Sequence, residues 1–495
     1  MICLTTTENT LTKALKQVER NKSYIDMVEL RLDLLEEGEL ASAQIFPRLC
    51  ALPTIATYRR VCDGGKSQMS DKARMTNLRK IVLQGDFSYV DIEEDVKKSD
   101  LKIKGEEDSP KYDFENELKQ KGIKIIRSFH DMEKLPANLF SLVTKLAKKG
   151  DIPKVAVTPN TIIDVVTLFK MNEELKDIKE KIIIGMGDFG VCTRILYKKV
   201  GSMLTFASED EIAPGQLSAK TLKLLYKADQ VNNRTNVYGI IGNPVLHTAS
   251  PMIHNPGFEA IHYNAIYVPF LVDKVRGFFK LAELIKIHGF SVTVPHKRDV
   301  LPYLGKITRE VKQIGACNTV TRIQGMWKGT NTDYYGFLAP IEKEINDGKI
   351  KSALIVGAGG ASRAVVWALR NHHVKVTIAN RTLEKAKLLA SETMSNYIEL
   401  EDLSSLSSSV DLVVQTTIVG MTPNEDADIL EDFTFENPCI VYDLVYKPRY
   451  TKLLKRAKKA NCKVINGSDM LISQGKLQFE SFSGYHYPHW INLNL

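Results

Sequence analysis

Short apolar, β-branched runs alternate with longer amphipathic segments over the first 218 residues. The amphipathic segments, such as NTLTKALKQVER and NLFSLVTKLAKKG, repeat their apolar positions with the period of a helix. The apolar runs number eight, and they are ICLTTT, MVELRLDL, PTIATYR, YVDIEE, IKIIRSF, KVAVTP, KIIIGM and SMLTFAS. Strands that alternate with helices form parallel βα units, and eight such units predict a (β/α)8 barrel whose site lies at the carboxyl ends of the strands.

The pattern changes after residue 218. A Lys-rich, polar stretch over residues 219–235 ends in QVNNRTN and is predicted to be a connector. A second α/β region starts at Val237, and the run ALIVGAGGASRA from Ala353 has the pattern of a nucleotide-binding strand, turn and helix. The segment from about Asn466 onward is again helical and ends in an aromatic tail.

The composition is that of an ordinary globular protein, with 44% hydrophobic and 25% charged residues among 495. At about 150 residues per domain, this length predicts two or three separate cores. The seven cysteines are scattered and form no C-x-x-C pair, which argues against a disulfide framework or a cysteine-rich zinc site. The sequence lacks the features of a signal peptide and any apolar run of the roughly 20 residues needed for a membrane span, so a cytoplasmic location is predicted.

The net charge of +8 does not by itself indicate a nucleic-acid partner. The lysines are spread along helical segments and do not gather in one arm with interleaved aromatic residues. A solvated surface or small anionic substrates account for the charge equally well. The sequence therefore predicts small-molecule substrates, with neither nucleic acid nor a membrane as a partner.

Charged residues on the predicted strands indicate a site inside the barrel. In MVELRLDLL, strand alternation puts Glu29, Arg31 and Asp33 on one face and apolar residues on the other. Charges facing a barrel interior are costly unless they are paired or bind something; an exposed edge strand is the alternative. In DIPKVAVTP, alternation sends Lys154 inward, where desolvation favours the neutral amine that attacks ketones. A surface lysine is the alternative there.

His130 ends the run IKIIRSFH and is predicted to share the carboxyl rim with Lys154. It is either a satisfied core histidine or, beside an imine-forming lysine, a general base and acid. Together these residues resemble type I 3-dehydroquinate dehydratases, which are (β/α)8 barrels that use a lysine Schiff base. The resemblance covers nearly all of residues 1–218 and rests on the E-x-R-x-D strand, Arg59 in TYR, His130, Lys154 in IPKVAV, Arg194 in CTR and Gln216 in APGQ.

This resemblance implies that Lys154 condenses with the ketone of 3-dehydroquinate and that His130 moves the protons of the dehydration. It implies that Arg194 and Gln216 hold the carboxylate and ring hydroxyls, and that Glu29, Arg31 and Arg59 belong to the same substrate-binding set. Two positions depart from the family pattern, with Asp63 in place of the usual Glu and Ile212 in place of a frequent Ser. These departures bear on efficiency more than on the type of reaction.

The run VGAGGASRA supplies glycines between an apolar strand and a helix-forming segment. In that context the pyrophosphate of a dinucleotide lies on backbone N–H groups at the start of the helix. The next strand, KVTIA, ends in Asn380, Arg381 and Thr382, where an NAD enzyme has an acidic residue for the ribose 2′-hydroxyl. Because arginine pairs with a 2′-phosphate, NADP is favoured over NAD; a solvated arginine at a helix start is the alternative.

Most of residues 236–490 resemble the shikimate dehydrogenase family. The segments that carry the resemblance are IGNPVLHTASPMIHN, FSVTVPHK, GACNTV, GTNTDYYG, QTTIVGMTP, YDLVYKP and DMLISQGKLQFE. The resemblance implies that Lys297 and Asp333 are the catalytic pair, which supplies a proton as hydride reaches the substrate carbonyl. It assigns the substrate contacts to Thr248, Ser250, Thr293, Asn318, Tyr446, Gln474 and Gln478, and the nucleotide contacts to Gly357, Gly359, Gly360, Ala361, Asn380, Arg381, Thr382 and Gly467. Thr248 replaces a usual Ser, and Gln415 replaces a common Asn beside the cofactor.

The expected fold is α/β throughout. It comprises a TIM barrel over residues 1–218, a linker over 219–235, a substrate-binding domain over 236–336 completed by 466–495, and an NADP-binding Rossmann domain over 337–465. The expected function is a bifunctional enzyme of the shikimate pathway, which dehydrates 3-dehydroquinate and then reduces 3-dehydroshikimate with NADPH, without a metal. Quinate metabolism is the alternative, and Ser250 argues against it because a threonine there is associated with quinate use. A regulatory pseudo-enzyme is the other alternative, and it conflicts with the presence of Lys154, His130, Lys297 and Asp333.

Overall fold

The computed structural model describes residues 1–103, 112–209, 215–406, 410–435 and 439–493. The chain divides into two compact units, residues 1–236 with 268–286 and residues 237–267 with 287–495. An eight-stranded sheet builds the first unit, and two six-stranded sheets follow along the chain. Among the described residues, no helix combines the length and the apolar character that crossing a membrane requires.

Eight parallel strands build a barrel in the first unit, in the order β10-β1-β2-β3-β4-β7-β8-β9. They are β1 (Ile2–Thr5), β2 (Met27–Arg31), β3 (Thr54–Thr57), β4 (Tyr89–Glu93), β7 (Lys124–Asp131), β8 (Ile152–Val157), β9 (Ile182–Gly185) and β10 (Thr205–Ala207). A backbone hydrogen bond of 2.9 Å from the Met203 amide to the Lys181 carbonyl joins the segments before β10 and β9 and so brings the two ends of the sheet together. All eight apolar runs are strands, which confirms the expected barrel.

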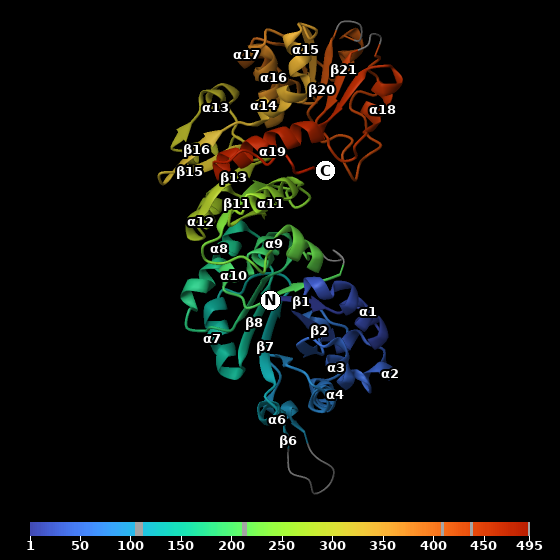
Figure 1. Ribbon diagram of the computed structural model, residues 1–495, viewed down its shortest axis with the longest axis vertical. Coiled ribbons are helices and arrows are strands. Elements are labelled where there is room, and N and C mark those ends of the chain that lie inside the picture. The colour runs from blue at the N-terminus through green and yellow to red at the C-terminus, as the bar shows by residue number, and fades with distance from the viewer. Residues whose placement is uncertain (104–111, 210–214, 407–409, 436–438, 494–495) are drawn as a thin grey trace. The chain divides into compact units, whose positions relative to one another are not determined.

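Helices surround the strands (Figure 1). They are α1 (Leu11–Asn21), α2 (Glu37–Leu40), α3 (Phe46–Cys50), α4 (Asp71–Gln84), α5 (Lys98–Leu101), α6 (Phe114–Gln120), α7 (Leu139–Lys149), α8 (Ile162–Glu174), α9 (Gly187–Ile195) and α10 (Tyr197–Val200). Sequence signals fix where they begin: Thr161 Oγ1 accepts the Asp164 amide at 3.2 Å while Asp164 accepts the Thr161 amide at 3.0 Å, a capping box that starts α8. A short hairpin of β5 (Lys102–Ile103) and β6 (Tyr112–Asp113) interrupts the βα rhythm after β4.

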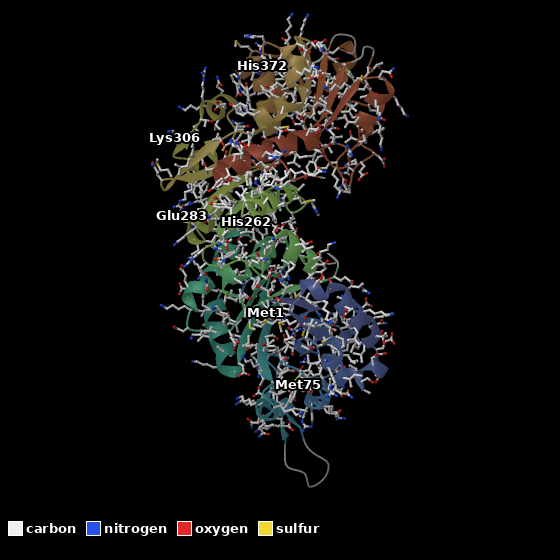
Figure 2. All side chains as sticks on the ribbon, in the orientation of Figure 1. Met1, Met75, His262, Glu283, Lys306 and His372 are labelled. Carbon is white, nitrogen blue, oxygen red and sulfur yellow. The ribbon has the colours of Figure 1, made fainter. Side chains whose placement is uncertain are left out.

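The barrel interior is apolar toward the amino ends of the strands. A buried cluster there contains Cys3, Met27, Ile55, Ile126, Ile152, Ala156, Ile182, Ile184, Leu204 and Phe206. Met1, labelled in Figure 2, closes this end: its ammonium donates to Tyr197 Oη at 2.9 Å and to the Met203 carbonyl at 3.0 Å. Ile152 and Lys154 share a face of β8, so strand alternation carries the lysine one layer nearer the carboxyl end.

The polar stretch after the barrel is packed and not extended. Thr221–Leu225 forms one turn of π-helix, η5, and Ala219, Leu222, Ala228 and Val231 are buried in the first unit. The domain boundaries expected from the sequence stay a prediction.

The second sheet has the order β12-β11-β13-β15-β16-β14. Its strands are β11 (Asn236–Gly242), β12 (Ala265–Leu271), β13 (Ile287–Val292), β14 (Lys306–Ile307), β15 (Thr319–Ile323) and β16 (Met326–Thr330). β13 runs parallel to β11 and antiparallel to β15, so the sheet is mixed. The helices along this stretch are α11 (Ser250–Ala260), α12 (Val275–Leu284), α13 (Arg309–Ile314), α14 (Asp333–Leu338) and α15 (Glu342–Asn346).

The third sheet is wholly parallel and has the order β19-β18-β17-β20-β21-β22. Its strands are β17 (Ser352–Val356), β18 (Lys375–Ala379), β19 (Asn396–Ile398), β20 (Leu412–Gln415), β21 (Ile440–Asp443) and β22 (Lys463–Asn466), with helices α16 (Gly360–Asn371), α17 (Leu383–Thr393), α18 (Lys452–Lys459) and α19 (Gly467–Ser483). Alternate residues of β17 enter two different cores, Ile355 one and Leu354 the other, because both faces of the sheet are covered. Numbered within the sheet, the strand order is 3-2-1-4-5-6, that of a dinucleotide-binding Rossmann fold.

Candidate active sites

Lys154 lies inside the barrel with 5% of its side chain exposed. Its Nζ donates to Asp91 Oδ2 at 2.8 Å, lies 3.9 Å from Glu29 Oε1 and stands 4.5 Å above the centre of the Phe206 ring. These neighbours come from β4, β2 and β10, so strands far apart in the sequence enclose one amine. The arrangement places a buried amine inside the barrel, where it can act as a nucleophile.

The charged residues of the second strand do not all lie on it. β2 ends at Arg31, and Asp33 lies in the 3₁₀ turn η2 (Leu32–Leu34), so the expectation of three charges on one strand face is wrong for Asp33. Glu29 is buried and accepts the hydroxyls of Thr5 and Thr57, each at 2.8 Å. Arg31 and Asp33 still meet in a two-bond ion pair of 2.8 and 2.7 Å, because Asp33 folds back to accept it. Backbone amides of Arg59 and Lys66 also donate to Asp33, and the pKa of its carboxyl stays below its ordinary value although burial opposes this.

Arg59 is buried and fully engaged with acidic side chains of β4. Its guanidinium contacts Asp91 Oδ2 at 2.9 Å and Glu93 Oε1 at 3.0 Å, and it donates to Ser128 Oγ at 3.2 Å. Burial lowers the pKa of Arg59 and these two carboxylates outweigh it, so the pKa lies above the ordinary range. Glu93 is also 2.8 Å from Arg74, which extends the pattern of alternating charges away from Lys154.

His130 lies on β7 beside this set of charges. Burial lowers the pKa of its imidazole well below the ordinary value, and the positive charges of Arg59, Lys154 and Arg31 lower it further, while Asp91 opposes them. Its Nδ1 is buried and has no hydrogen-bond partner among the described residues. A neutral imidazole with a free ring nitrogen is suited to accept a proton.

Arg194, on α9, is a cation that forms no ion pair with a carboxylate of the described residues. Its Nε is buried without a hydrogen-bond partner among the described residues, and burial lowers the pKa of the guanidinium to about 10. Such a group is suited to receive an anion from outside the protein. Gln216 is half-buried in the segment that follows the barrel, and Ile212 lies outside the described residues.

Asp63 belongs to a 3₁₀ turn, η4 (Val61–Asp63), and accepts Arg60 Nε at 2.7 Å. Arg60 also reaches Asp95 at 2.8 Å. The Asp63 carboxylate is thus paired with Arg60, three residues earlier in the sequence.

Sequence reasoning missed Asp91, Glu93 and Ser128. In YVDIEE, strand alternation puts Asp91 and Glu93 on one face and Val90 and Ile92 on the other, which is the signal already used for Glu29 and Arg31. Ser128 precedes His130 by two residues on β7 and donates to Asp91 Oδ1 at 2.5 Å. The same alternation was therefore available to find all three.

The second candidate site lies where Lys297 meets Asp333. Lys297 follows β13 and Asp333 begins α14, and their Nζ and Oδ2 atoms are 2.6 Å apart with 12% and 8% of the side chains exposed. Asn318 Nδ2 donates to the other Asp333 oxygen at 2.8 Å and to Thr332 Oγ1 at 2.9 Å. Hydrogen bonds from neighbouring polar side chains therefore fix the geometry of the pair.

Gln474 and Gln478 approach the polar side chains around Asn318 from α19. Gln474 Oε1 lies 3.4 Å from both Asn318 Nδ2 and Thr332 Oγ1. Gln478 is 2% exposed, accepts Ser291 Oγ at 2.7 Å and donates to the Asn318 carbonyl at 3.2 Å and to Thr319 Oγ1 at 3.1 Å. Since its amide is satisfied by protein groups, Gln478 holds Asn318 in place in this structure.

Four further predicted substrate residues come from three loops and a helix start. Thr248 Oγ1 donates to Ser250 Oγ at 3.1 Å and accepts the Ser250 amide at 3.2 Å. Tyr446 is half-buried, and burial raises the pKa of its phenol although a hydrogen bond with the backbone of Ala249 opposes this. Thr293 is half-buried after β13, and its amide donates to the Ile241 carbonyl at 2.9 Å. The Ser250 side chain is 4% exposed and the others remain partly open to solvent.

The glycine turn between β17 and α16 is shaped by close approaches. Gly357 has a φ of +117°, and a Cβ there would lie 2.3 Å from Thr416 Oγ1. A Cβ on Gly360 would lie 2.9 Å from Lys297 Cδ, whereas a Cβ on Gly359 would meet nothing within 4 Å. The turn is therefore open at Gly359 and closed against the Lys297 side chain at Gly360. Ala361 follows as the second residue of α16.

The end of β18 carries the predicted 2′-phosphate contacts. Arg381 is exposed and forms no ion pair with a described carboxylate, and Asn380 Nδ2 donates to the Thr382 carbonyl at 2.8 Å. Gly467 starts α19, and a Cβ there would lie 2.2 Å from the Leu444 carbonyl, so the close packing of two backbones explains this glycine. Gln415, at the end of β20, is buried and donates to the Val419 carbonyl at 3.0 Å and to Asp443 Oδ1 at 3.2 Å.

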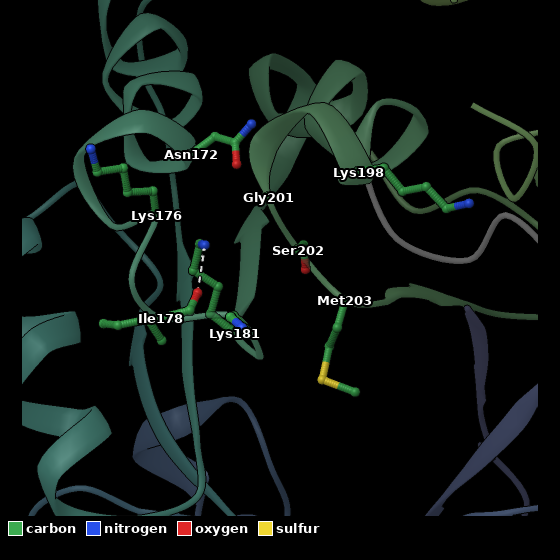
Figure 3. A pocket seen from close by; sticks show the side chains of 9 residues that line it. Asn172, Lys176, Ile178, Lys181, Lys198, Gly201, Ser202 and Met203 are labelled. Atoms are coloured by element: carbon green, nitrogen blue, oxygen red, sulfur yellow. Dashed lines mark hydrogen bonds between the residues drawn. The ribbon is translucent and has the colours of Figure 1, made fainter. Parts of the chain in front are cut away.

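A cavity of about 370 Å³ lies elsewhere, beside the segments that precede β9 and β10 (Figure 3). Lysines contribute much of its lining, and Lys181 donates to the carbonyls of Ile178 at 2.8 Å and Leu175 at 3.2 Å, at the carboxyl end of α8. None of the predicted site residues lines this cavity. Among the described residues there is also no group of three or more His, Cys, Asp or Glu side chains able to hold a metal ion.

Comparison with known proteins gives one pattern for each part of the chain. Residues 2–233 match the family model of type I 3-dehydroquinase, residues 240–320 that of the shikimate dehydrogenase substrate binding domain, and residues 340–442 that of shikimate/quinate 5-dehydrogenase.

Individual relatives follow the same division. A bifunctional 3-dehydroquinate dehydratase/shikimate dehydrogenase, chloroplastic, of Arabidopsis thaliana is 32% identical over 95% of this chain and 80% of its own length. The NADP(+) shikimate dehydrogenases of Caldanaerobacter subterraneus and Methanocaldococcus jannaschii are 38% and 39% identical, over 52% and 51% of this chain and 94% and 93% of their own lengths.

Proposed function

The chain belongs to the family of bifunctional 3-dehydroquinate dehydratase/shikimate dehydrogenases, and from this premise we propose which of its residues carry each reaction. It is a multifunctional enzyme of the shikimate pathway, with a lyase activity in the barrel and an oxidoreductase activity in the second half. One observation carries the proposal: each half holds a lysine paired with an aspartate, the buried Lys154 with Asp91 at 2.8 Å and the half-buried Lys297 with Asp333 at 2.6 Å.

In the barrel, Lys154 forms an imine with the ketone of 3-dehydroquinate. The iminium makes the neighbouring C–H acidic, since the electron pair left behind delocalises toward the positive nitrogen. The neutral imidazole of His130 removes that proton and returns it to the departing hydroxyl. Arg194, whose Nε has no partner among the described residues, binds the substrate carboxylate together with Gln216, and Arg31 orients a ring hydroxyl.

Glu29 and Arg59 act from behind the substrate. Glu29 lies 3.9 Å from the Lys154 nitrogen, with its oxygens held by two threonine hydroxyls. Arg59 binds two acidic side chains of β4, so its contribution to hydroxyl contacts requires a rearrangement on substrate binding.

In the second half, Lys297 donates the proton that the substrate oxygen needs as its carbon is reduced. Asp333 fixes the position of that amine through the 2.6 Å contact. The ring hydroxyls and carboxylate of shikimate are contacted by six residues, Thr248, Ser250, Thr293, Asn318, Gln474 and Tyr446. Gln478 holds Asn318 in place by a hydrogen bond to its carbonyl.

The residues around the glycine turn fit NADPH, which supplies the hydride when bound. At the start of α16, its pyrophosphate would be held by Gly357, Gly359, Gly360 and Ala361. Its adenosine 2′-phosphate would be held by Asn380, Arg381 and Thr382. Gly467, where α19 begins, completes the proposed cofactor-binding set. A Cβ at Gly359 would meet nothing within 4 Å, which supports a phosphate there, and the exposed Arg381 forms no ion pair with a carboxylate of the described residues. No metal is part of this proposal.

The partners we propose are the small molecules alone: 3-dehydroquinate, 3-dehydroshikimate, shikimate and NADPH. Neither nucleic acid nor a membrane is among them. The seven cysteines are free thiols, which supports a reducing compartment such as the cytoplasm.

The test is a coupled assay on the full chain. Purified protein receives 3-dehydroquinate and NADPH, and the enone absorbance of 3-dehydroshikimate and the loss of NADPH are followed together. We expect wild type to make shikimate, Lys154→Ala to block the first step, and Lys297→Ala to accumulate 3-dehydroshikimate. Sodium borohydride with the first substrate adds a reduced adduct at Lys154, detected by peptide mass spectrometry. Wild type without either signal would refute the assignment.

Quinate is the second substrate to test. The side-chain pair Thr248 and Ser250 keeps a small hydroxyl at its second position, which favours shikimate. The oxidation of shikimate and of quinate by NADP+ is compared at equal concentrations, and a higher kcat/KM for quinate would reverse this preference.

A further inference from the structure

Asp91 is the point where the buried charges of the barrel meet. One carboxylate oxygen lies 2.8 Å from Lys154 Nζ and 2.9 Å from Arg59 Nη2, and the other accepts Ser128 Oγ at 2.5 Å. None of the Asp91 side chain is exposed to solvent. Arg59 and the buried Lys154 favour the ionised form and hold the pKa of Asp91 below its ordinary value against the cost of burial. Asp91 is therefore a permanent, oriented anion beside the nucleophile.

The other groups that face Lys154 Nζ balance its positive charge less than Asp91 does. Glu29 on β2 is 3.9 Å away, and its oxygens already accept hydroxyls from Thr5 and Thr57. The Cys3 thiol on β1 stays protonated because burial and Glu29 raise its pKa well above the ordinary value. His130 on β7 is neutral, Phe206 on β10 offers a ring face, and Arg59 adds a second positive charge. The direct ion pair of Lys154 is thus the one with Asp91.

The charge at this nitrogen is the same before and after imine formation. The ammonium gives up protons, its nitrogen bonds to the ketone carbon, and the carbonyl oxygen leaves as water carrying two protons. An ammonium and a ketone thereby become a protonated imine and water, so nitrogen carries one positive charge in the resting state and again in the iminium, and is neutral only while it attacks. An anion fixed 2.8 Å away stabilises both charged forms and disfavours the neutral nitrogen.

We propose that Asp91 is the positioning residue of the dehydratase, which aims the Lys154 nitrogen and remains its counter-ion as ammonium and as iminium. Ser128 and Arg59 hold the carboxylate in that orientation from two sides. The inference rests on the proposed dehydratase function and adds a residue to it. It also predicts that Asp91 sets the pH range in which the imine forms, because the charged nitrogen forms lose their direct counter-ion when the anion is removed.

Asp91→Asn tests the proposal in the full chain. We expect kcat for dehydration to fall by about 100-fold or more while KM changes by less than about threefold, since Asp91 is not among the proposed substrate contacts and Arg59 keeps its ion pair with Glu93. We also expect the pH profile of borohydride trapping at Lys154 to move down by at least about one pH unit. Glu93→Gln is the matched control: it removes the same charge from the same strand and from the same arginine, but does not touch Lys154. Its trapping profile should stay at the wild-type pH.

The outcomes separate this inference from the proposed function. Wild type that forms no borohydride adduct refutes the dehydratase itself. If wild type is trapped, two results overturn the role of Asp91 alone. One is a trapping profile of Asp91→Asn at the same pH as that of wild type. The other is a trapping profile of Glu93→Gln that shifts as far as that of Asp91→Asn. If Asp91→Asn does not fold, Ser128→Ala decides: it keeps every charge and removes one hydrogen bond to Asp91. A kcat about fivefold lower at unchanged KM supports positioning, and an unchanged kcat rejects it.

Discussion

Arg194 offers a prediction in which stability and ligand binding move in opposite directions. The side chain lies on α9 with its Nε buried and unpaired among the described residues. In Arg194→Met an unbranched apolar chain of similar length replaces the cation. We expect the substituted protein to be more stable than wild type in the absence of substrate and unable to bind the substrate carboxylate.

The magnitude follows from the depressed pKa. Burial takes the guanidinium from its ordinary 12.5 to about 10, and a shift of this size corresponds to about 3 kcal/mol. Because the folded pKa is the lower one, the folded state carries this cost at every pH below about 10 and loses it only as the pH rises toward the ordinary value. Part of the side chain reaches solvent, so we expect about 1–2 kcal/mol of the cost to be recovered at neutral pH.

The assay is thermal unfolding of the full chain by calorimetry, with and without 3-dehydroshikimate. We expect the barrel transition of Arg194→Met to rise by about 2–6 °C and to lose the increase that the ligand gives to wild type. Arg127→Met is the matched control, because this arginine is 2% exposed but pairs with Glu115 and donates to the carbonyls of Glu93 and Lys149. Loss of a paired cation should lower the same transition.

Two results would contradict the reasoning. An Arg194→Met barrel that melts below wild type means that the guanidinium already has a stabilising partner. An Arg194→Met barrel that the ligand still stabilises fully means that the carboxylate binds elsewhere.

Three further predictions concern the second half. A Cβ on Gly360 would meet Lys297 Cδ at 2.9 Å, so Gly360→Ala should lower the kcat of shikimate oxidation by about tenfold or more. A Cβ on Gly359 would meet nothing within 4 Å, so Gly359→Ala should mainly raise the KM for NADP+. Steady-state kinetics with both coenzyme and substrate varied would reveal the same effect in both variants if the lysine contact is irrelevant. Arg381→Asp should reduce kcat/KM for NADP+ by about 100-fold and leave that for NAD+ within about threefold; equal losses for both coenzymes would count against a 2′-phosphate contact. Burial raises the pKa of Asp443 to about 6, so its ionisation costs stability above that pH and the protein should gain about 2 kcal/mol as the pH falls from 7 toward 4. Asp443→Asn, compared with wild type by denaturant unfolding at both pH values, should lose most of this gain, and an unchanged pH dependence would point to other groups.

The sequence alone determined the layers of the protein. Eight apolar runs at regular spacing became the eight barrel strands, and the glycine turn after β17 opens a helix in a parallel sheet of Rossmann order. These features depend on local periodicity and on turn chemistry, which neighbouring residues fix among themselves. The comparisons confirm the bifunctional dehydratase and dehydrogenase function that the motifs predicted.

Only the tertiary structure decided which side chains became partners. Strand alternation predicts that Lys154 faces inward. Its pairing with Asp91 depends on the register of β4 and β8 along the barrel axis. Asp33 lies in a 3₁₀ turn after the strand, where its carboxylate accepts hydrogen bonds from Arg31 and from two backbone amides. The Arg59 guanidinium pairs with acidic side chains of β4. Gly360 came against Lys297 although 63 positions separate them in the chain. Period-two and glycine patterns give the direction of a side chain, whereas long-range packing and charge pairing choose what it meets.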